Sequence, residues 1–156
     1  GLVNLAQPPV RRSTNASPAM SLSTTSNVSR ENAVNRTDDA KAVAAVMDAY
    51  IAGTKNSDVA GLKKIFHPDA SMSGYFGPNI MIGTPQPFYD ELEANEVGPE
   101  YAAHVVSVVV TGNTALGRII EDNLLGLSFV NDFHLIKMDG DWLIISKLYH
   151  HDNPKG

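Results

Sequence analysis

The hydrophobic period of the chain changes at Gly98-Pro99, and this change constrains the fold more than any other feature. Before it, apolar residues recur at helical spacing; after it, residues 101–152 are rich in β-branched and aromatic side chains. Helices followed by a meander of strands predict an α+β domain, in which three helices wrap one face of a curved antiparallel sheet. Three turn signals divide the second part into four predicted strands. The turns lie at Gly112-Asn113, between Asp122 and Gly126, and at Asp139-Gly140.

Three predicted helices and one short strand precede the meander. The first helix begins at Thr37, a capping residue followed by two aspartates. The second follows a cap at Ser57 or Asp58 and ends before "HPD", because a residue that precedes proline disfavours helix. After a short strand at "ASMSGYFG", the third runs from Thr84-Pro85 to about Asn95. The apolar stripe of the first helix consists of Val43, Val46, Met47, Tyr50 and Ile51.

The first 36 residues differ in kind from the rest of the chain. They contain no aromatic residue and are rich in Ser, Asn, Thr, Ala and Pro, so they cannot bury enough apolar surface to offset the entropy lost on ordering. We therefore predict a tail or linker over residues 1–36 and a single domain over residues 37–156. A start on glycine fits the removal of an export signal, which leaves an exported or periplasmic location and a cytoplasmic one both open.

Charge and composition argue against several classes of function. The net charge is −5, with +3 on residues 1–36 and −8 on residues 37–156, so the domain should repel a nucleic acid backbone. No apolar run approaches the ~20 residues that span a bilayer, and no membrane association is expected. Cysteine is absent, the histidines lack metal-ligand spacing, and no glycine-rich phosphate loop occurs. We therefore expect no metal site and no cofactor.

Two of the predicted strands are apolar on both faces, as the segments "VVSVVV" and "LIISKLY" show. Helices that cover one face of an antiparallel sheet leave the other face open to water or to a partner. Apolar side chains on that second face predict its burial, and we expect a homodimer formed through the sheet.

Two segments of the chain resemble a known family. The segment "AYIAGTKNSDVAGLKKIFHPDASM" is similar to the opening of the nuclear transport factor 2-like superfamily, and "DFHLIKMDGDWLIISKLYH" is similar to its closing hairpin. The resemblance covers about residues 39–152, and it is strongest for the branch labelled putative lumazine-binding, near the polyketide cyclase-like (SnoaL-like) and ketosteroid isomerase-like proteins. It implies a cone-shaped, cystatin-like α+β fold with an apolar pocket, and many members dimerise through the sheet.

An ungapped comparison with the ketosteroid isomerases places three of their functional positions on this chain. Tyr50 falls at their oxyanion-hole tyrosine and Asp132 at an acid that they keep neutral, while Gly74 falls at the carboxylate that is their general base. Loss of a general base removes roughly 10²- to 10⁴-fold of the rate acceleration. The resemblance therefore implies that this chain is not a steroid isomerase.

The closing hairpin predicts the neighbours of Asp132. With Asp139-Gly140 as a two-residue turn and unbroken pairing, Asp132 lies opposite Lys147 and His134 lies opposite Ile145. A cation directly across the strands lowers the pKa of a carboxyl group, which predicts an ionised Asp132 paired with Lys147. The alternative is a solvated surface pair worth about 0.2–1 kcal/mol, with Tyr50 as an ordinary core residue.

These residues support two classes of function. The first is a small-molecule-binding protein for an apolar or heteroaromatic ligand, whose pocket is lined by Tyr50, Asp132, His134 and Lys147, with Leu143 and Ile145 on the same wall. The second is a lyase or isomerase, in which His134 is the general acid or base near Asp132 and Tyr50 polarises an oxygen atom. A structural module with a closed core is a third reading of the same pattern.

Overall fold

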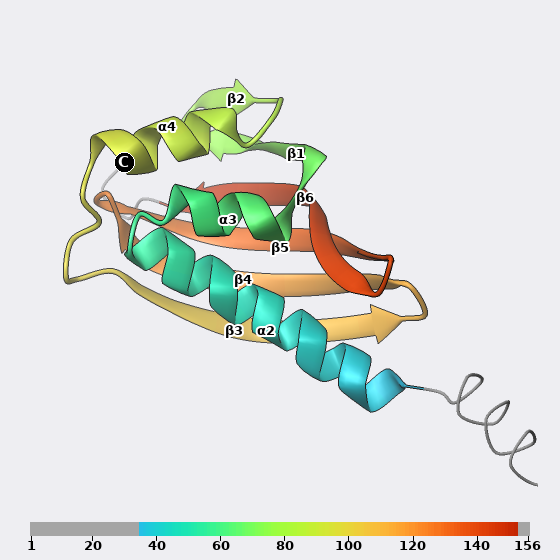
Figure 1. Cartoon of the computed structure of the whole chain (residues 1–156). Helices are drawn as coiled ribbons and strands as arrows, with labels where there is room; N and C mark the ends of the chain where they lie inside the picture. Colours follow the sequence, from blue (N-terminus) through green and yellow to red (C-terminus); the bar gives the residue numbers. More distant parts are fainter. Residues whose placement is uncertain (1–34, 153–156) are drawn as a thin grey trace, which may run out of the picture. The chain divides into compact units, whose positions relative to one another are not determined.

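The computed structural model describes residues 35–152. The predicted tail over residues 1–36 lies almost entirely outside this part of the chain, so the division into tail and domain stays a prediction. This part of the chain holds three helices and six strands. Figure 1 shows the helices and the first two strands ahead of the meander. The elements are α2 (Arg36–Lys55), α3 (Val59–Ile65), β1 (Phe66–Phe76), β2 (Asn79–Met81), α4 (Gln86–Ala94), β3 (Ala102–Thr111), β4 (Thr114–Leu124), β5 (Leu127–Met138) and β6 (Asp141–Asp152).

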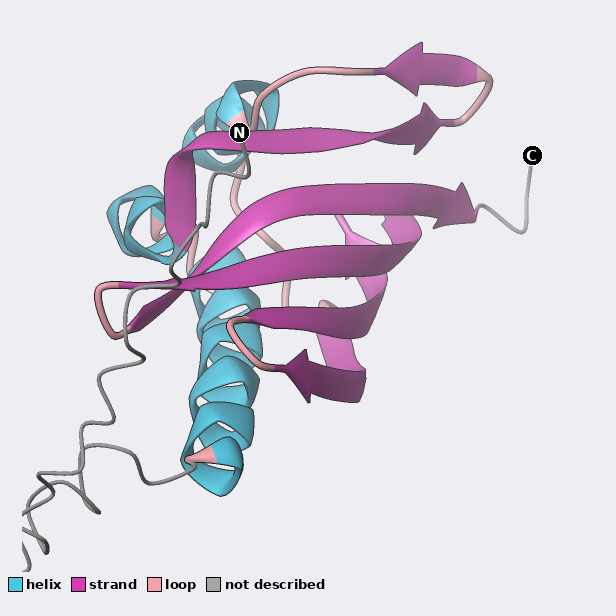
Figure 2. Cartoon of the chain, turned by 90° about the vertical axis from the view of Figure 1, so that its right-hand side faces the viewer, coloured by secondary structure: helices cyan, strands magenta, loops and turns pink. Residues whose placement is uncertain are grey.

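The six strands form one curved sheet in the order β2-β1-β6-β5-β4-β3. All neighbouring strands are antiparallel except β1 and β6, which are parallel. The sheet does not close, because β2 and β3 each have only one neighbour. Figures 1 and 2 show the three helices on one face, called the inner face below, and the opposite face is called the outer face. The predicted α+β layout, three helices wrapped on a curved sheet, is confirmed.

Two strands differ from the predicted pattern. β1 begins at Phe66 and includes the segment "HPD", because the extended conformation that proline imposes on His67 suits a strand. The pairing of β1 with β6 shifts register between Phe66 and Ser71, and such an irregularity tolerates the missing amide proton of Pro68. β2 was not predicted, since its three exposed residues are too few to form a pattern.

The core lies between α2 and the inner face of the sheet. Val43, Met47 and Tyr50 of α2 are fully buried, which confirms the predicted stripe at these positions. Gly117 on β4 allows the close approach of this helix, because a Cβ atom there would lie 2.6 Å from Met47 Sδ. The sheet contributes the buried side chains Ala115, Ile119, Phe129, Phe133, Leu135, Trp142 and Ile144.

A register shift in the closing hairpin changes which side chains face inward. The predicted pairing holds from the turn as far as Leu135 opposite Ile144, and then Ile145 is passed over, so that His134 pairs with Ser146. Lys147 therefore lies opposite Phe133, and Asp132 lies opposite Leu148. Because side chains alternate along a strand, the bulge reverses the face of every later residue of β6. The predicted pair of Asp132 with Lys147 is wrong.

Candidate functional site

A chain of buried polar side chains crosses the inner face. Lys147 Nζ on β6 donates to the hydroxyl of Tyr50 on α2 over 2.7 Å, and this hydroxyl donates to Glu121 Oε1 on β4 over 3.1 Å. The carboxylate of Glu121 also accepts from Asn131 Nδ2 at 2.6 Å and from the Tyr101 hydroxyl at 2.6 Å. Tyr50 and Asn131 are fully buried and Lys147 is 5% exposed. Three hydrogen bonds thus satisfy a carboxylate that could not otherwise be buried.

Burial sets the protonation states of this cluster. Desolvation lowers the pKa of Lys147 from its usual 10.5 to about 8, although the charge of Glu121 opposes the shift. Desolvation, with the charge of Glu121, raises the pKa of Tyr50 well above its usual value. Tyr50 therefore stays protonated: its hydroxyl donates a hydrogen bond to Glu121 and accepts one from Lys147. The result is a cation and a carboxylate joined through one neutral hydroxyl.

Lys147 also reaches a cavity of about 530 Å³, called the inner cavity below. Its ammonium lies 4.6 Å from the ring centroid of Phe88 and 5.7 Å from that of Tyr149, within the range of cation–π attraction. Tyr50 and Glu121 lie behind Lys147 and do not line the cavity. The remaining lining is mostly apolar: Met72, Phe76, Met81, Ile82, Gly83, Thr84, Pro87, Glu91, Leu124, Leu125, Leu127 and Phe129.

Of the six residues that the sequence singles out, only Tyr50 and Lys147 belong to this inner cluster. Asp132 is on the outer face, where Arg118 Nε and Nη2 donate to its two carboxylate oxygens at 2.7 and 2.9 Å. The hydrogen bond from Arg118 lowers the pKa of Asp132, so the carboxyl group is ionised as predicted but through another cation. His134 and Ile145 are exposed. Leu143 is partly buried, and its two chain neighbours Trp142 and Ile144 are the ones that point inward.

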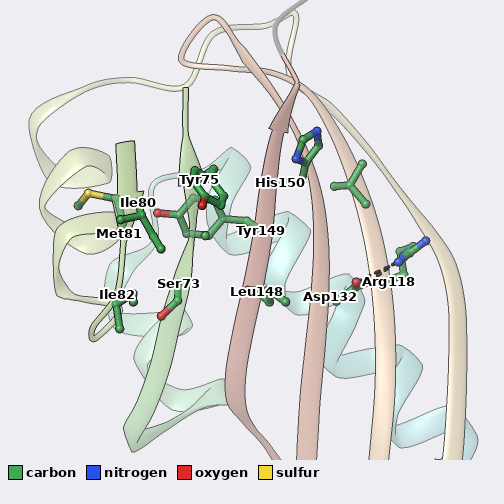
Figure 3. Close-up of a pocket in the computed structure, with 12 residues that line it drawn as sticks. Ser73, Tyr75, Ile80, Met81, Ile82, Arg118, Asp132, Leu148, Tyr149 and His150 are labelled. Atoms are coloured by element: carbon green, nitrogen blue, oxygen red, sulfur yellow. Dashed lines mark hydrogen bonds and ion pairs between the residues drawn. The ribbon is translucent and has the colours of Figure 1, made fainter. Parts of the chain in front are cut away.

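Asp132 lines a second hollow of about 600 Å³ on the outer face. Figure 3 shows its ion pair with Arg118 at one side and Leu148 on the strand between, with Tyr75, Ile80 and Ile82 across from them. The side chains of Arg118 and Asp132 remain 51% and 43% exposed. Asp132 therefore lies in a concave surface, but on the opposite side of the sheet from Tyr50.

Sequence reasoning missed Glu121, Asn131 and Tyr101. Glu121 could have been recognised from the alternation of side chains along the strand, which places it on the same face as Ile119. An acid that shares a face with a core isoleucine requires buried partners. Its partner Tyr50 is 71 residues away in the chain, so no local pattern connects the two side chains.

Comparison with known proteins identifies the family. The family model described as putative lumazine-binding matches residues 38–150, which is most of the chain. The chain belongs to this family. Solved structures of the same fold are described as NTF2-like, so the predicted membership of the nuclear transport factor 2-like superfamily is confirmed.

Three relatives show how far the similarity extends. An NTF2-like protein of unknown function from Shewanella baltica OS155 is 26% identical, with a TM-score of 0.71 over 77% of this chain and 98% of that one. A ketosteroid isomerase-like protein from Erwinia carotovora atroseptica SCRI1043 is 19% identical, with a TM-score of 0.57 over 74% and 98%, and shows the fold alone. Aldolase FrzH from a Cladobotryum species is 27% identical over 110 residues, which are 70% of this chain and 88% of that protein.

Membership of the putative lumazine-binding family supports the binding of a small molecule in general. Within residues 35–152 of this family member, no helix is long and apolar enough to cross a membrane. The same part of the chain places no three His, Asp or Glu side chains together as a metal site.

Proposed function

We propose that this protein binds a small, mostly apolar molecule in the inner cavity and holds an electron-rich oxygen atom of that molecule against Lys147. The observation that carries the proposal is the position of Lys147, which is the one cation among the described residues that line this cavity. A buried ammonium surrounded by apolar side chains attracts a carbonyl or anionic oxygen strongly, since few water molecules compete for it.

The size and lining of the inner cavity suit a ligand with a flat apolar body. Its volume falls within the roughly 300–1,000 Å³ of typical small-molecule sites. Phe88, Phe129 and Tyr149 present aromatic rings on which a planar ligand can stack. Tyr50 acts indirectly in this proposal, because its hydroxyl positions the Lys147 ammonium.

A pair of fluorescent probes tests the proposal. 1-Anilinonaphthalene-8-sulfonate carries an anion, and N-phenyl-1-naphthylamine has the same aromatic body without it. We expect the wild type to bind both probes. Lys147→Met should weaken the sulfonate probe about tenfold, because it removes a charge-assisted contact worth about 1.5 kcal/mol, and should change the neutral probe less than about twofold.

The matched control is Arg118→Met, which removes an equal charge from the outer face. It should leave the affinity of the inner cavity for both probes unchanged. Equal weakening of the sulfonate probe in the two variants would show a general charge effect and would contradict binding at Lys147. A Leu127→Trp variant, which fills the inner cavity, should weaken both probes together.

A second candidate is a lyase or isomerase, and the relative named Aldolase FrzH favours it. The cluster of Lys147, Tyr50 and Glu121 offers an amine, a hydroxyl and a carboxylate in hydrogen-bonded series, which is a path for proton transfer. His134 and Asp132, the acid–base pair of the sequence prediction, both lie on the outer face, where Asp132 lines the outer hollow and His134 does not. They cannot act with Tyr50, because the sheet lies between them.

We also propose a homodimer formed through the outer face of the sheet. Supporting it, Val109, Leu116, Ile120 and Leu148 are each at least two-fifths exposed there, and burial of such side chains favours association. Leu116→Lys should convert the dimer to a monomer in sedimentation velocity at tens of micromolar, a range above typical dimer constants. Met138→Glu, at the hairpin turn, is the control that should stay dimeric. A monomeric wild type at these concentrations would contradict the proposal.

A further inference from the structure

The amine of Lys147 is held in an unusual setting. Within residues 35–152, no carboxylate lies at ion-pair distance from its Nζ atom, whose hydrogen-bond partner is the Tyr50 hydroxyl. The aromatic rings of Tyr50, Phe88 and Tyr149 surround it, and the inner cavity lies in front of it. A lysine that only fills space in a core would not need an open cavity beside its nitrogen atom. The geometry is that of an amine presented to a ligand.

We propose that Lys147 forms a Schiff base with an aldehyde or ketone that is bound in the inner cavity. This inference rests on the proposed function, because the carbonyl compound must first enter that cavity. It goes further by assigning a covalent step and a ligand class, a carbonyl group on a mostly apolar body.

Lys147, Tyr50 and Glu121 can carry every proton that formation of the Schiff base moves. The ammonium of Lys147 releases a proton toward the Tyr50 hydroxyl, which passes its own proton to Glu121. The amine lone pair attacks the carbonyl carbon, so that a nitrogen–carbon bond forms while the π bond between carbon and oxygen breaks. The oxygen then takes a proton from this nitrogen atom to give a carbinolamine. The carbon–oxygen bond then breaks, the hydroxyl leaves as water with the proton returned through Tyr50, and an iminium ion remains. Neither an oxidant nor a reductant is required.

Protonation favours this chemistry near neutral pH. An amine attacks a carbonyl only in its neutral form. A pKa of about 8 makes the neutral fraction at pH 7 about 300-fold larger than a pKa of 10.5 would allow. The other ionisable groups that face Nζ are Tyr50 from α2, Tyr149 from β6, Glu121 from β4 behind Tyr50, and Glu91 from α4 at the cavity lining. Burial raises the pKa of both tyrosines, so both keep their protons at neutral pH.

Reductive trapping tests the proposal on the full chain. The protein is incubated with 6-methoxy-2-naphthaldehyde and sodium cyanoborohydride, and the modified residues are located by peptide mass mapping. We expect Lys147 to be labelled at least about tenfold faster than the exposed residue Lys64, with a yield that rises as the pH passes through about 8. Lys147→Met and Lys147→Arg should abolish that label. Lys64→Met should keep the label on Lys147.

The corresponding alcohol, 6-methoxy-2-naphthalenemethanol, separates binding from covalent chemistry. It should bind in the inner cavity, as its own fluorescence reports, and should suppress labelling of Lys147 while leaving the labelling of Lys64 unchanged. If the alcohol binds but Lys147 is labelled no faster than Lys64, the Schiff base is wrong and the binding proposal stands. If neither compound binds and no selective label forms, both proposals are wrong. Circular dichroism on each variant confirms that the fold is kept.

Discussion

Replacement of Glu121 by leucine is expected to lower the free energy of unfolding by about 3–5 kcal/mol. The carboxylate accepts hydrogen bonds from Tyr50, Tyr101 and Asn131. Leucine would leave both tyrosine hydroxyls without an acceptor, and Asn131 Nδ2 would keep only its bond to the carbonyl oxygen of Ile119. It would also remove the only negative charge that reaches the Lys147 ammonium through Tyr50 among the described residues. Urea unfolding followed by circular dichroism measures the loss.

Two further variants separate the charge from the hydrogen bonds. Glu121→Gln keeps an acceptor oxygen, and the tyrosine hydroxyls can rotate toward it, so the loss should be only about 1–3 kcal/mol. The double variant Glu121→Leu with Lys147→Met should lose less than the sum of the single losses, because it also removes the uncompensated cation. Asp122→Ala, at the next and exposed position, should change stability by less than about 0.5 kcal/mol. A Glu121→Leu protein as stable as Asp122→Ala would mean that the buried cluster does not exist.

The elements were predictable because their signals are local. A capping residue, an apolar stripe or an Asp-Gly turn lies within a few residues of the element that it defines, and the strand ends at Gly112-Asn113 and Asp139-Gly140 are confirmed. Tyr50 was recognised from its place in a helical stripe and is indeed fully buried. Its hydrogen bonds were not predictable from that stripe, since they come from strands far along the chain.

The inner and outer sites could not be separated from the sequence because one bulge decides between them. Ile144 and Ile145 are adjacent and equally suited to either face of a strand, so the pattern of β6 gives no sign that one of them is passed over. Without the bulge, Lys147 would lie opposite Asp132 on the outer face, whereas the prediction placed this pair in one pocket with Tyr50. With it, Lys147 joins Tyr50 in the core and Asp132 pairs with Arg118. A single extra residue thus assigns the charged groups to opposite faces.

Gly74→Asp tests whether the missing general base could be restored, and we expect it to destabilise the protein instead of creating an isomerase. Gly74 on β1 lies opposite Tyr149 on the parallel strand β6, and its φ of +157° is one that residues with a side chain rarely adopt. A Cβ atom at this position would overlap the carbonyl oxygen of Tyr149 and lie 2.8 Å from its ring. The two strands would have to separate, which should cost at least about 3 kcal/mol.

The overlap arises at Cβ, so the nature of the rest of the side chain should matter little. Gly74→Ala should therefore be destabilised nearly as much as Gly74→Asp, which would distinguish steric overlap from the burial of a charge. Gly77→Asp is the matched control: its φ is +61° but nothing lies within 4 Å of the added Cβ, so it should lose only about 1–2 kcal/mol. If Gly74→Ala kept full stability while Gly74→Asp did not, the close approach of β1 and β6 at this position would be wrong. Because Tyr149 also lines the inner cavity, both Gly74 variants should weaken the neutral naphthylamine probe, whereas Gly77→Asp should not.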